Sequence, residues 1–133
     1  MQKNNDNAIS MSGWPIVETR FYHAAKDDEV THWLCDLTSL LNKFSPFVMV
    51  IITPKNAAFS MEGQKAQAKW FKQHKLLIEQ YCQGLARVVE SAKQADQLDT
   101  QALQNAMPMP FLVTTEIDQA RCWAKNQFAS EVS

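Results

Sequence analysis

The run Phe47–Ile52, Phe-Val-Met-Val-Ile-Ile, constrains the fold of this chain more than any other segment. Its six apolar residues are too few to span a membrane and are rich in β-branched side chains, so they predict a strand that is buried on both faces. A strand of this kind belongs inside a parallel sheet with helices on either side. The segment Thr53–Phe59 follows the carboxyl end of this strand, which is where open α/β sheets place their functional surface.

Strands and helices alternate along the rest of the chain. We expect strands at Ile16–His23, Phe47–Ile52, Leu85–Glu90 and Phe111–Thr114. We expect helices from Asp27 or Asp28 to Phe44, from Ser60 to Tyr81 with Gly84 as a left-handed stop, across Ser91–Ala106 as one irregular or two short helices, and from Thr115 to Phe128. This alternation predicts right-handed crossovers. The expected fold is therefore one small α/β domain with a mainly parallel sheet of four to five strands, flanked by about four helices.

Two of the predicted helices carry an apolar stripe at three- and four-residue spacing, which is the pattern of a helix that packs on a sheet. In the first helix the stripe consists of Val30, Trp33, Leu34, Leu37, Leu41 and Phe44. In the second helix it consists of Ala66, Trp70, Leu77, Ile78 and Tyr81, and the lysines lie largely on other faces.

The length of 133 residues fits one domain, which we place at residues 14–133. Residues 1–13 are polar and aperiodic, so we expect a mobile N-terminal arm. The net charge of -1 and the lack of a basic patch argue against nucleic acid as a partner. Three widely spaced cysteines predict buried free thiols in a reducing compartment. Because no segment has the pattern of a signal peptide or a membrane span, we expect a cytoplasmic protein.

Four segments, together with the amphipathic first helix, resemble one family. They are the strand Val48–Thr53, the helix start Ser60–Gly63, the strand Gly84–Val89 and the closing run Thr114–Trp123, Thr-Thr-Glu-Ile-Asp-Gln-Ala-Arg-Cys-Trp. Over Val17–Phe128 the chain resembles the STAS domain, in particular its divergent anti-sigma-factor-antagonist-like branch. The typical family has an additional leading strand, which residues near Ser10–Trp14 would have to supply.

The resemblance implies a small non-enzymatic switch that binds a partner protein around the start of the second helix. Regulated members carry a phosphorylatable serine there. Ser60 matches that serine directly, and with a one-residue shift Glu62 takes its place, although the chain lacks the Asp-Ser-Ser-Gly sequence of those members. A serine before a helix is also a sufficient N-cap, which contributes about 1 kcal/mol. Ser60 therefore has two interpretations, a helix cap and a phosphosite at a helix N-terminus that favours phosphate.

The leading functional hypothesis is that residues 54–63 bind a partner protein or a second copy of this chain. Phe59 and Met61 are the expected apolar anchors of this surface, and its expected polar rim consists of Lys55, Asn56, Ser60 and Glu62. Phe59 has an alternative role, because it can fold back over the helix as a hydrophobic staple.

Two other functions stay open. The same fold resembles lipid-binding CRAL-TRIO domains, and a core cavity lined by Trp33, Leu37, Trp70 and Trp123 would carry an apolar small molecule. Catalysis has the least support, because the histidines and cysteines are scattered and no spacing assembles an acid, a base and a nucleophile. The chain has neither a glycine-rich phosphate loop nor metal-ligand spacing, so we expect no cofactor and no metal.

Overall fold

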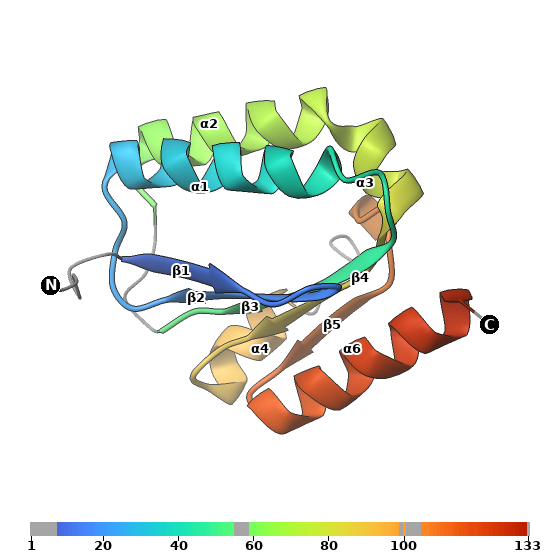
Figure 1. The fold of residues 1–133 in the computed structure, drawn as a ribbon. Helices are drawn as coiled ribbons and strands as arrows, with labels where there is room; N and C mark the ends of the chain where they lie inside the picture. The colour runs from blue at the N-terminus through green and yellow to red at the C-terminus, as the bar shows by residue number, and fades with distance from the viewer. Residues whose placement is uncertain (1–7, 55–58, 99, 101–104, 133) are drawn as a thin grey trace, which may run out of the picture.

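Figure 1 shows the fold in a computed structural model that describes residues 8–54, 59–98, 100 and 105–132. Five strands form one sheet in the order β1-β2-β3-β4-β5. They are β1 (Ile9–Ser12), β2 (Ile16–Phe21), β3 (Phe47–Ile52), β4 (Cys82–Val88) and β5 (Phe111–Thr114). β1 is antiparallel to β2, and all other neighbours are parallel. The prediction of an α/β domain with a mainly parallel sheet is confirmed.

Helices cover both faces of this sheet (Figure 1). On one face, α1 (Asp27–Leu41) and α2 (Met61–Gln73) lie side by side, and α3 (Lys75–Tyr81) follows α2. On the other face, α6 (Ile117–Val132) packs against β3 and β4, while α4 (Ala92–Leu98) contacts β5. Among the described residues, no helix combines the length and the apolar character that crossing a membrane requires.

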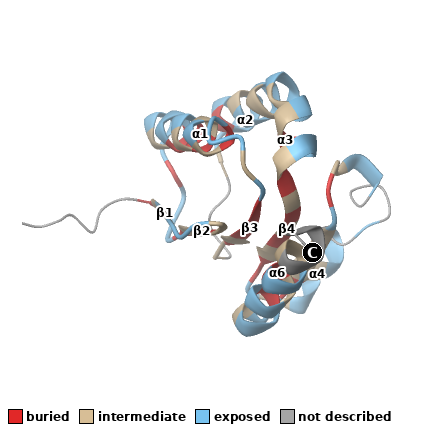
Figure 2. Ribbon diagram, turned by 45° about the vertical axis from the view of Figure 1, so that its right-hand side comes forward, coloured by how far each residue is buried: buried red, intermediate tan, exposed pale blue. Residues whose placement is uncertain are grey.

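The sheet divides the core into two layers, and β3 contributes to both. Phe47 and Met49 pack in the layer beneath α1 and α2. Val48, Val50 and Ile52 pack in the layer beneath α6. Figure 2 shows β3 as a largely buried strand at the centre of the molecule. This is the double-sided burial that the apolar run predicts.

The apolar stripe of α1 packs as its spacing predicts. Its buried residues are Val30, Trp33, Leu34, Leu37 and Leu41. The helix begins after Lys26, which is the N-cap residue, so Asp27 and Asp28 lie inside the first turn and not at the cap. The helix ends at Leu41, before the predicted end at Phe44. Phe44 lies beyond it with φ of 50°, in the left-handed region.

The prediction of a mobile arm over residues 1–13 is wrong for its second half. Ile9–Ser12 form β1, which pairs antiparallel with β2. Ala8 is fully buried, and its N–H donates a hydrogen bond to the carboxylate of Glu29 in the first turn of α1. The polar sequence concealed this strand because backbone pairing with β2 holds it in place, without a long apolar run. Residues 1–7 lie outside the described residues.

The predicted helix 60–81 consists of two helices that meet at His74. The imidazole of His74 stacks on Trp70, and its Nδ1 lies 2.8 Å from the Trp70 carbonyl oxygen. The strand that follows begins at Cys82, so Gly84 lies inside β4 and does not end a helix. A Cβ atom on Gly84 would lie 3.0 Å from Cη2 of Trp123. Gly84 therefore serves the close approach of α6 to the sheet, and the interpretation as a left-handed stop is wrong.

We expect Gly84→Ala to destabilise the protein by about 1–3 kcal/mol, because the new methyl group overpacks the contact with Trp123. Urea unfolding followed by circular dichroism measures the free energy of unfolding. Trp123→Phe removes the ring atoms nearest to Gly84, so Gly84→Ala should cost less in that background. An equal cost in both backgrounds would show that Trp123 does not limit the side chain at position 84.

Candidate functional site

Ser60 caps α2 and joins the start of this helix to the start of α1. Its Oγ accepts a hydrogen bond from the Gly63 N–H at 3.0 Å, and its hydroxyl donates to Oδ1 of Asp27 at 2.5 Å. The Ser60 backbone is extended, as is usual for an N-cap residue. The N-cap interpretation of Ser60 is therefore confirmed. The hydrogen bond to Asp27 could not be predicted from the sequence, because the two residues are far apart in the chain.

The contact with Asp27 determines what a phosphate on Ser60 would meet. The free amides and the dipole of a helix N-terminus favour negative charge. However, Asp27 and Asp28 already place two carboxylates in the first turn of α1, and Glu62 places another in the first turn of α2. A phosphate on Ser60 would lose the hydrogen bond to Asp27 and replace it with a like-charge contact. Phosphorylation of Ser60 stays a prediction, and it carries this electrostatic cost.

Met61, Glu62 and Lys65 at the start of α2 face the solvent, while Gly63 is buried. Met61 leaves 73% of its surface exposed. Glu62 and Lys65 form an ion pair of 3.7 Å along the helix, and both side chains are largely exposed. We call Ser60, Met61, Glu62 and Lys65 the α2-start surface. Two other predicted members of the binding surface, Lys55 and Asn56, lie outside the described residues.

Phe59 belongs to the core, so the expectation that it offers an exposed apolar anchor is wrong. Its ring centroid lies 5.5 Å from that of Phe21 and 6.1 Å from that of Trp33. The side chain is partly buried and packs against the layer beneath α1. It turns inward, as in the staple alternative, but its ring contacts lie on β2 and α1. Sequence spacing could not show this, because those contacts depend on the tertiary fold.

The four residues predicted to line one apolar cavity lie on opposite faces of the sheet. Trp33 and Leu37 are buried beneath α1, and Trp70 packs against the same layer while its indole N–H donates to Oγ1 of Thr38 at 2.8 Å. Trp123 belongs to the layer beneath α6. The prediction of a single cavity lined by these four residues is therefore wrong.

A hollow of about 350 Å³ opens at the carboxyl edge of the sheet, which is where parallel sheets place ligands. Thr53 and Pro54, which follow β3, form part of its wall. Apolar residues at the strand ends, including Ile52 and Val88, form another part, together with Ile117 at the start of α6. Its surroundings combine apolar and charged groups, so no single ligand chemistry dominates it.

The histidines are separated from one another. His32 pairs with Asp36 at 3.6 Å on an exposed face of α1, and His74 stacks on Trp70 of α2. In the parts of the chain that the structure describes, no group of three or more histidine, cysteine or carboxylate side chains is arranged to hold a metal ion.

All three cysteines are free, but only one of them is buried. Burial raises the pKa of the Cys82 thiol to about 12, so Cys82 is a core thiol with little thiolate character. Cys35 and Cys122 are exposed on α1 and α6. The expectation that all three thiols are buried is wrong for these two, because each lies on the outer face of an amphipathic helix.

A group of aromatic residues lies at the amino end of the parallel strands, at the opposite end of the sheet from the segment Thr53–Phe59. Phe44 is 58% exposed, and its ring centroid lies 6.0 Å from that of Tyr81. Trp14 stacks on Phe47 at 5.8 Å, and the Lys43 ammonium lies 5.2 Å from the Trp14 ring. The left-handed backbone of Phe44 costs a non-glycine residue about 1–2 kcal/mol. Of these residues, Trp14, Lys43 and Phe44 form a second exposed surface, distinct from the α2-start surface.

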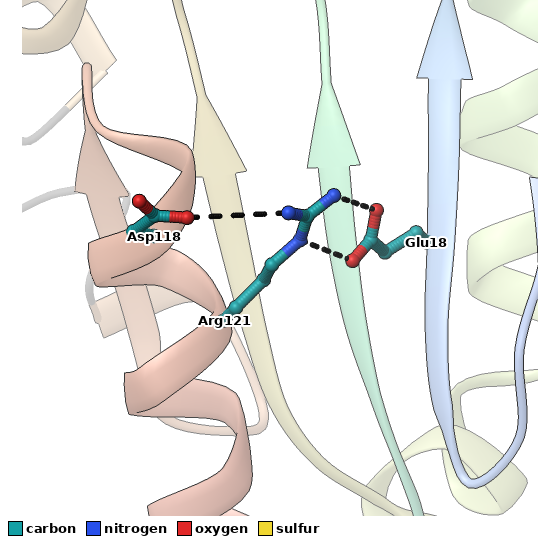
Figure 3. Close-up of polar contacts among 3 residues, drawn as sticks. All are labelled: Glu18, Asp118 and Arg121. Carbon is teal, nitrogen blue, oxygen red and sulfur yellow. Dashed lines mark hydrogen bonds and ion pairs between the residues drawn. The ribbon is translucent and has the colours of Figure 1, made fainter.

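A bidentate ion pair joins β2 to α6 (Figure 3). Nε and Nη2 of Arg121 donate to the two carboxylate oxygens of Glu18 at 2.7 and 3.0 Å, and a carboxylate oxygen of Asp118 lies 4.0 Å from Nη1. The hydrogen bonds from Arg121 hold the pKa of Glu18 below its ordinary value of 4.5, against the opposing effect of partial desolvation. This contact adds a polar link between α6 and β2 to the apolar packing of α6 on the sheet.

A solved structure shares this arrangement of strands and helices. It is an uncharacterized protein of the DUF3478 family, with a SpoIIAA-like fold, from Shewanella loihica PV-4. The two structures superpose with a TM-score of 0.70 over 93% of this chain and 98% of that chain, at 15% sequence identity. The chain has a SpoIIAA-like fold. No family model and no curated protein matches the sequence.

The SpoIIAA-like fold confirms the STAS resemblance at the level of architecture. β1 supplies the leading strand that the resemblance required near Ser10–Trp14. At 15% identity the likeness establishes the fold alone, so the role of each residue has to be argued from the geometry of this chain.

The contact between Ser60 and Asp27 predicts the effect of a negative charge at position 60 of this SpoIIAA-like domain. Ser60→Asp and Ser60→Asn introduce two caps of nearly the same shape that differ in charge. We expect the aspartate to gain about 0.5 kcal/mol relative to the asparagine when Asp27→Asn removes the facing carboxylate. Urea unfolding of the four variants at low ionic strength measures this difference. A gain of zero would mean that Asp27 does not repel a charge at position 60.

The lowered pKa of Glu18 predicts a loss of stability in acid. Because the folded-state pKa lies below the ordinary value of 4.5, the ion pair stabilises the fold fully above pH 4.5, and this contribution is lost as the pH falls through the folded-state pKa. The urea midpoint should therefore fall less between neutral pH and acid in Glu18→Gln than in the wild type. Identical pH profiles for the two proteins would contradict the prediction.

Proposed function

We propose that this chain is a non-catalytic module that binds a partner protein through the α2-start surface. The observation that carries the proposal is the exposure of Met61 in the first turn of a helix whose start is held in place. Apolar side chains of this kind, surrounded by polar residues, are the usual anchors of protein interfaces.

The start of α2 has little freedom to move, which supports a binding role. Ser60 connects α2 to Asp27 of α1. The residue before it, Phe59, packs against the aromatic rings of Phe21 and Trp33. A surface that is already ordered loses less conformational entropy when a partner binds. Met61 and Glu62 therefore present a fixed apolar and acidic pair.

The charges around Met61 favour a partner with basic residues. Asp27 and Asp28 lie in the first turn of α1, and Glu62 lies beside Met61. Lys65 offsets one of these charges. The expected partner therefore offers an apolar pocket bordered by lysine or arginine, and its binding should weaken as the salt concentration rises.

In this proposal Ser60 is first of all a structural cap. Phosphorylation of Ser60 would break the hydrogen bond to Asp27 and repel that carboxylate, so it would disturb the α2-start surface. Phosphorylation would therefore act as an off switch for binding.

The remaining properties in the proposal follow from composition. The net charge of -1 supports a protein partner over nucleic acid. The three free thiols, two of them exposed, fit the reducing environment of the cytoplasm. Binding to a second copy of the chain is the simplest form of the proposal, and sedimentation velocity would detect it.

The test compares two exposed apolar residues on the same layer of helices. Met61→Asp places a charge in the α2-start surface, while Leu76→Asp places one on α3, where Leu76 is 81% exposed. Because both side chains are exposed, both variants should keep the wild-type fold, which circular dichroism would verify. Each protein is used to capture partners from the native host, and the affinity of a captured partner is then measured with purified proteins.

We expect the Met61 variant to lose roughly tenfold or more in affinity and the Leu76 variant to bind like the wild type. Equal binding by both variants would move the interface away from α2. The first region to examine would then be the aromatic group around Phe44.

A further inference from the structure

A largely enclosed guanidinium group, that of Arg87, has no acidic partner among the residues that the structure describes. Arg87 is the sixth residue of β4, and its neighbours Ala86 and Val88 face α6. Because side chains alternate along a strand, Arg87 points to the same side as Leu85, into the layer beneath α1 and α2. Its Nη2 donates to Oγ1 of Thr53 at 3.3 Å. Its Nε is buried and has no hydrogen-bond partner among the described residues.

Burial of this kind is costly for a cation. Taking an arginine out of water without a compensating negative charge is energetically unfavourable. Burial lowers the pKa of the Arg87 guanidinium, which expresses the same cost. Within the described residues, the contact with Thr53 is the one hydrogen bond of the Arg87 side chain, and no carboxylate forms an ion pair with it. The fold retains a charge here that it does not itself neutralise.

The free Nε defines the kind of group that Arg87 can bind. Nε and Nη2 lie on the same edge of a guanidinium, and together they match two oxygens of a carboxylate or a phosphate. Arg121 uses the same two atoms to bind both oxygens of Glu18, at 2.7 and 3.0 Å. At Arg87, Nη2 has one proton directed at Thr53 and a second proton available, while the Nε proton lacks an acceptor.

The position of Arg87 supports a ligand site. It lies one residue from the carboxyl end of β4, and Thr53 follows the carboxyl end of β3, so the pair stands at the edge where parallel sheets bind ligands. The Arg87 side chain is only partly enclosed. This leaves a route from the solvent at that edge.

The same layer holds two more buried polar atoms without a partner. They are Oγ1 of Thr19 and Nε1 of Trp33. Thr19 and Arg87 are both register partners of Ile51, from the strands on either side, and Trp33 faces this layer from α1. All three groups can donate a hydrogen bond. Together with Nε of Arg87, these are polar atoms of one layer that the described residues leave without a hydrogen-bond partner.

We propose that Arg87 and Thr53 bind an oxyanion, a carboxylate or phosphate group, at the carboxyl end of β3 and β4. The oxyanion accepts hydrogen bonds from Nε and Nη2 of Arg87 and neutralises its charge. This site is separate from the α2-start surface, and the inference does not depend on the proposed partner.

The experiment measures thermal unfolding and calorimetric binding with potassium phosphate, potassium succinate and potassium chloride at matched ionic strength. The melting temperature of the wild type should rise with phosphate or succinate and not with chloride. The response to phosphate compared with succinate identifies the preferred oxyanion. Arg87→Met should raise the melting temperature in chloride, because it removes an unpaired buried charge, and should weaken oxyanion binding roughly tenfold or more.

Two further variants make the result specific. Arg87→Lys keeps the charge but lacks the pair of parallel N–H donors that a guanidinium offers. This variant should fold and should bind the oxyanion more weakly than the wild type does. Lys125→Met removes one exposed charge from α6 and should bind like the wild type. An equal response to the oxyanions in the wild type and in Arg87→Met would overturn the proposal. So would a wild type that responds to neither phosphate nor succinate.

Discussion

The burial of β3 on both faces is the constraint on which the rest of this structure depends. A central strand with no face in water is stable only when helices cover both sides of the sheet. α1 and α2 cover one side, and α6 covers the other, where its apolar residues pack on β3 and β4 and Arg121 contacts Glu18. The side chains in the interior are therefore packed against one another. The groups available for binding lie on the outer faces of the helices and at the edges of the sheet.

The carboxyl edge of the sheet contains both residues that pack in the core and residues that are available for binding. The chain leaves β3 at Thr53 and returns to the helical layer at Phe59, which is packed into the aromatic core. Ser60 then begins α2 and contacts Asp27. One end of the sheet thus combines an ordered helix start, an exposed Met61 and a partly buried Arg87 whose Nε is buried. The amino end offers an aromatic surface around Phe44 and no comparable polar groups among the residues described there.

The parts of the fold that follow from local sequence were predictable. β3 was predictable from its apolar run, α1 from its stripe, and the cap at Ser60 from the residue type before a helix. The errors have a common cause, which is that they depend on contacts between distant residues. β1 exists because β2 offers a pairing edge, Gly84 is needed because Trp123 approaches it, and Phe59 turns inward because Phe21 and Trp33 receive it.

The candidate sites show the same limit. The residue types before α2 indicate the cap at Ser60 but not its hydrogen bond to Asp27, and an arginine within a strand pattern does not reveal whether an acid faces it. One signal for Arg87 was present in the sequence. A charged residue in the middle of the apolar run Leu85–Val89 requires either a solvent-exposed face or a buried partner, and the helices on both sides of the sheet leave little solvent.

The ends of the sheet have a consequence for how this domain associates with other molecules. Both terminal strands, β1 and β5, are only four residues long. Short edges offer few unpaired backbone groups, so they are poor templates for the addition of a foreign strand. The β-branched central strand β3 is itself paired on both sides, so it offers no free edge to another chain. We expect partners of this chain to bind through contacts with its side chains and not by adding a strand to the edge of its sheet.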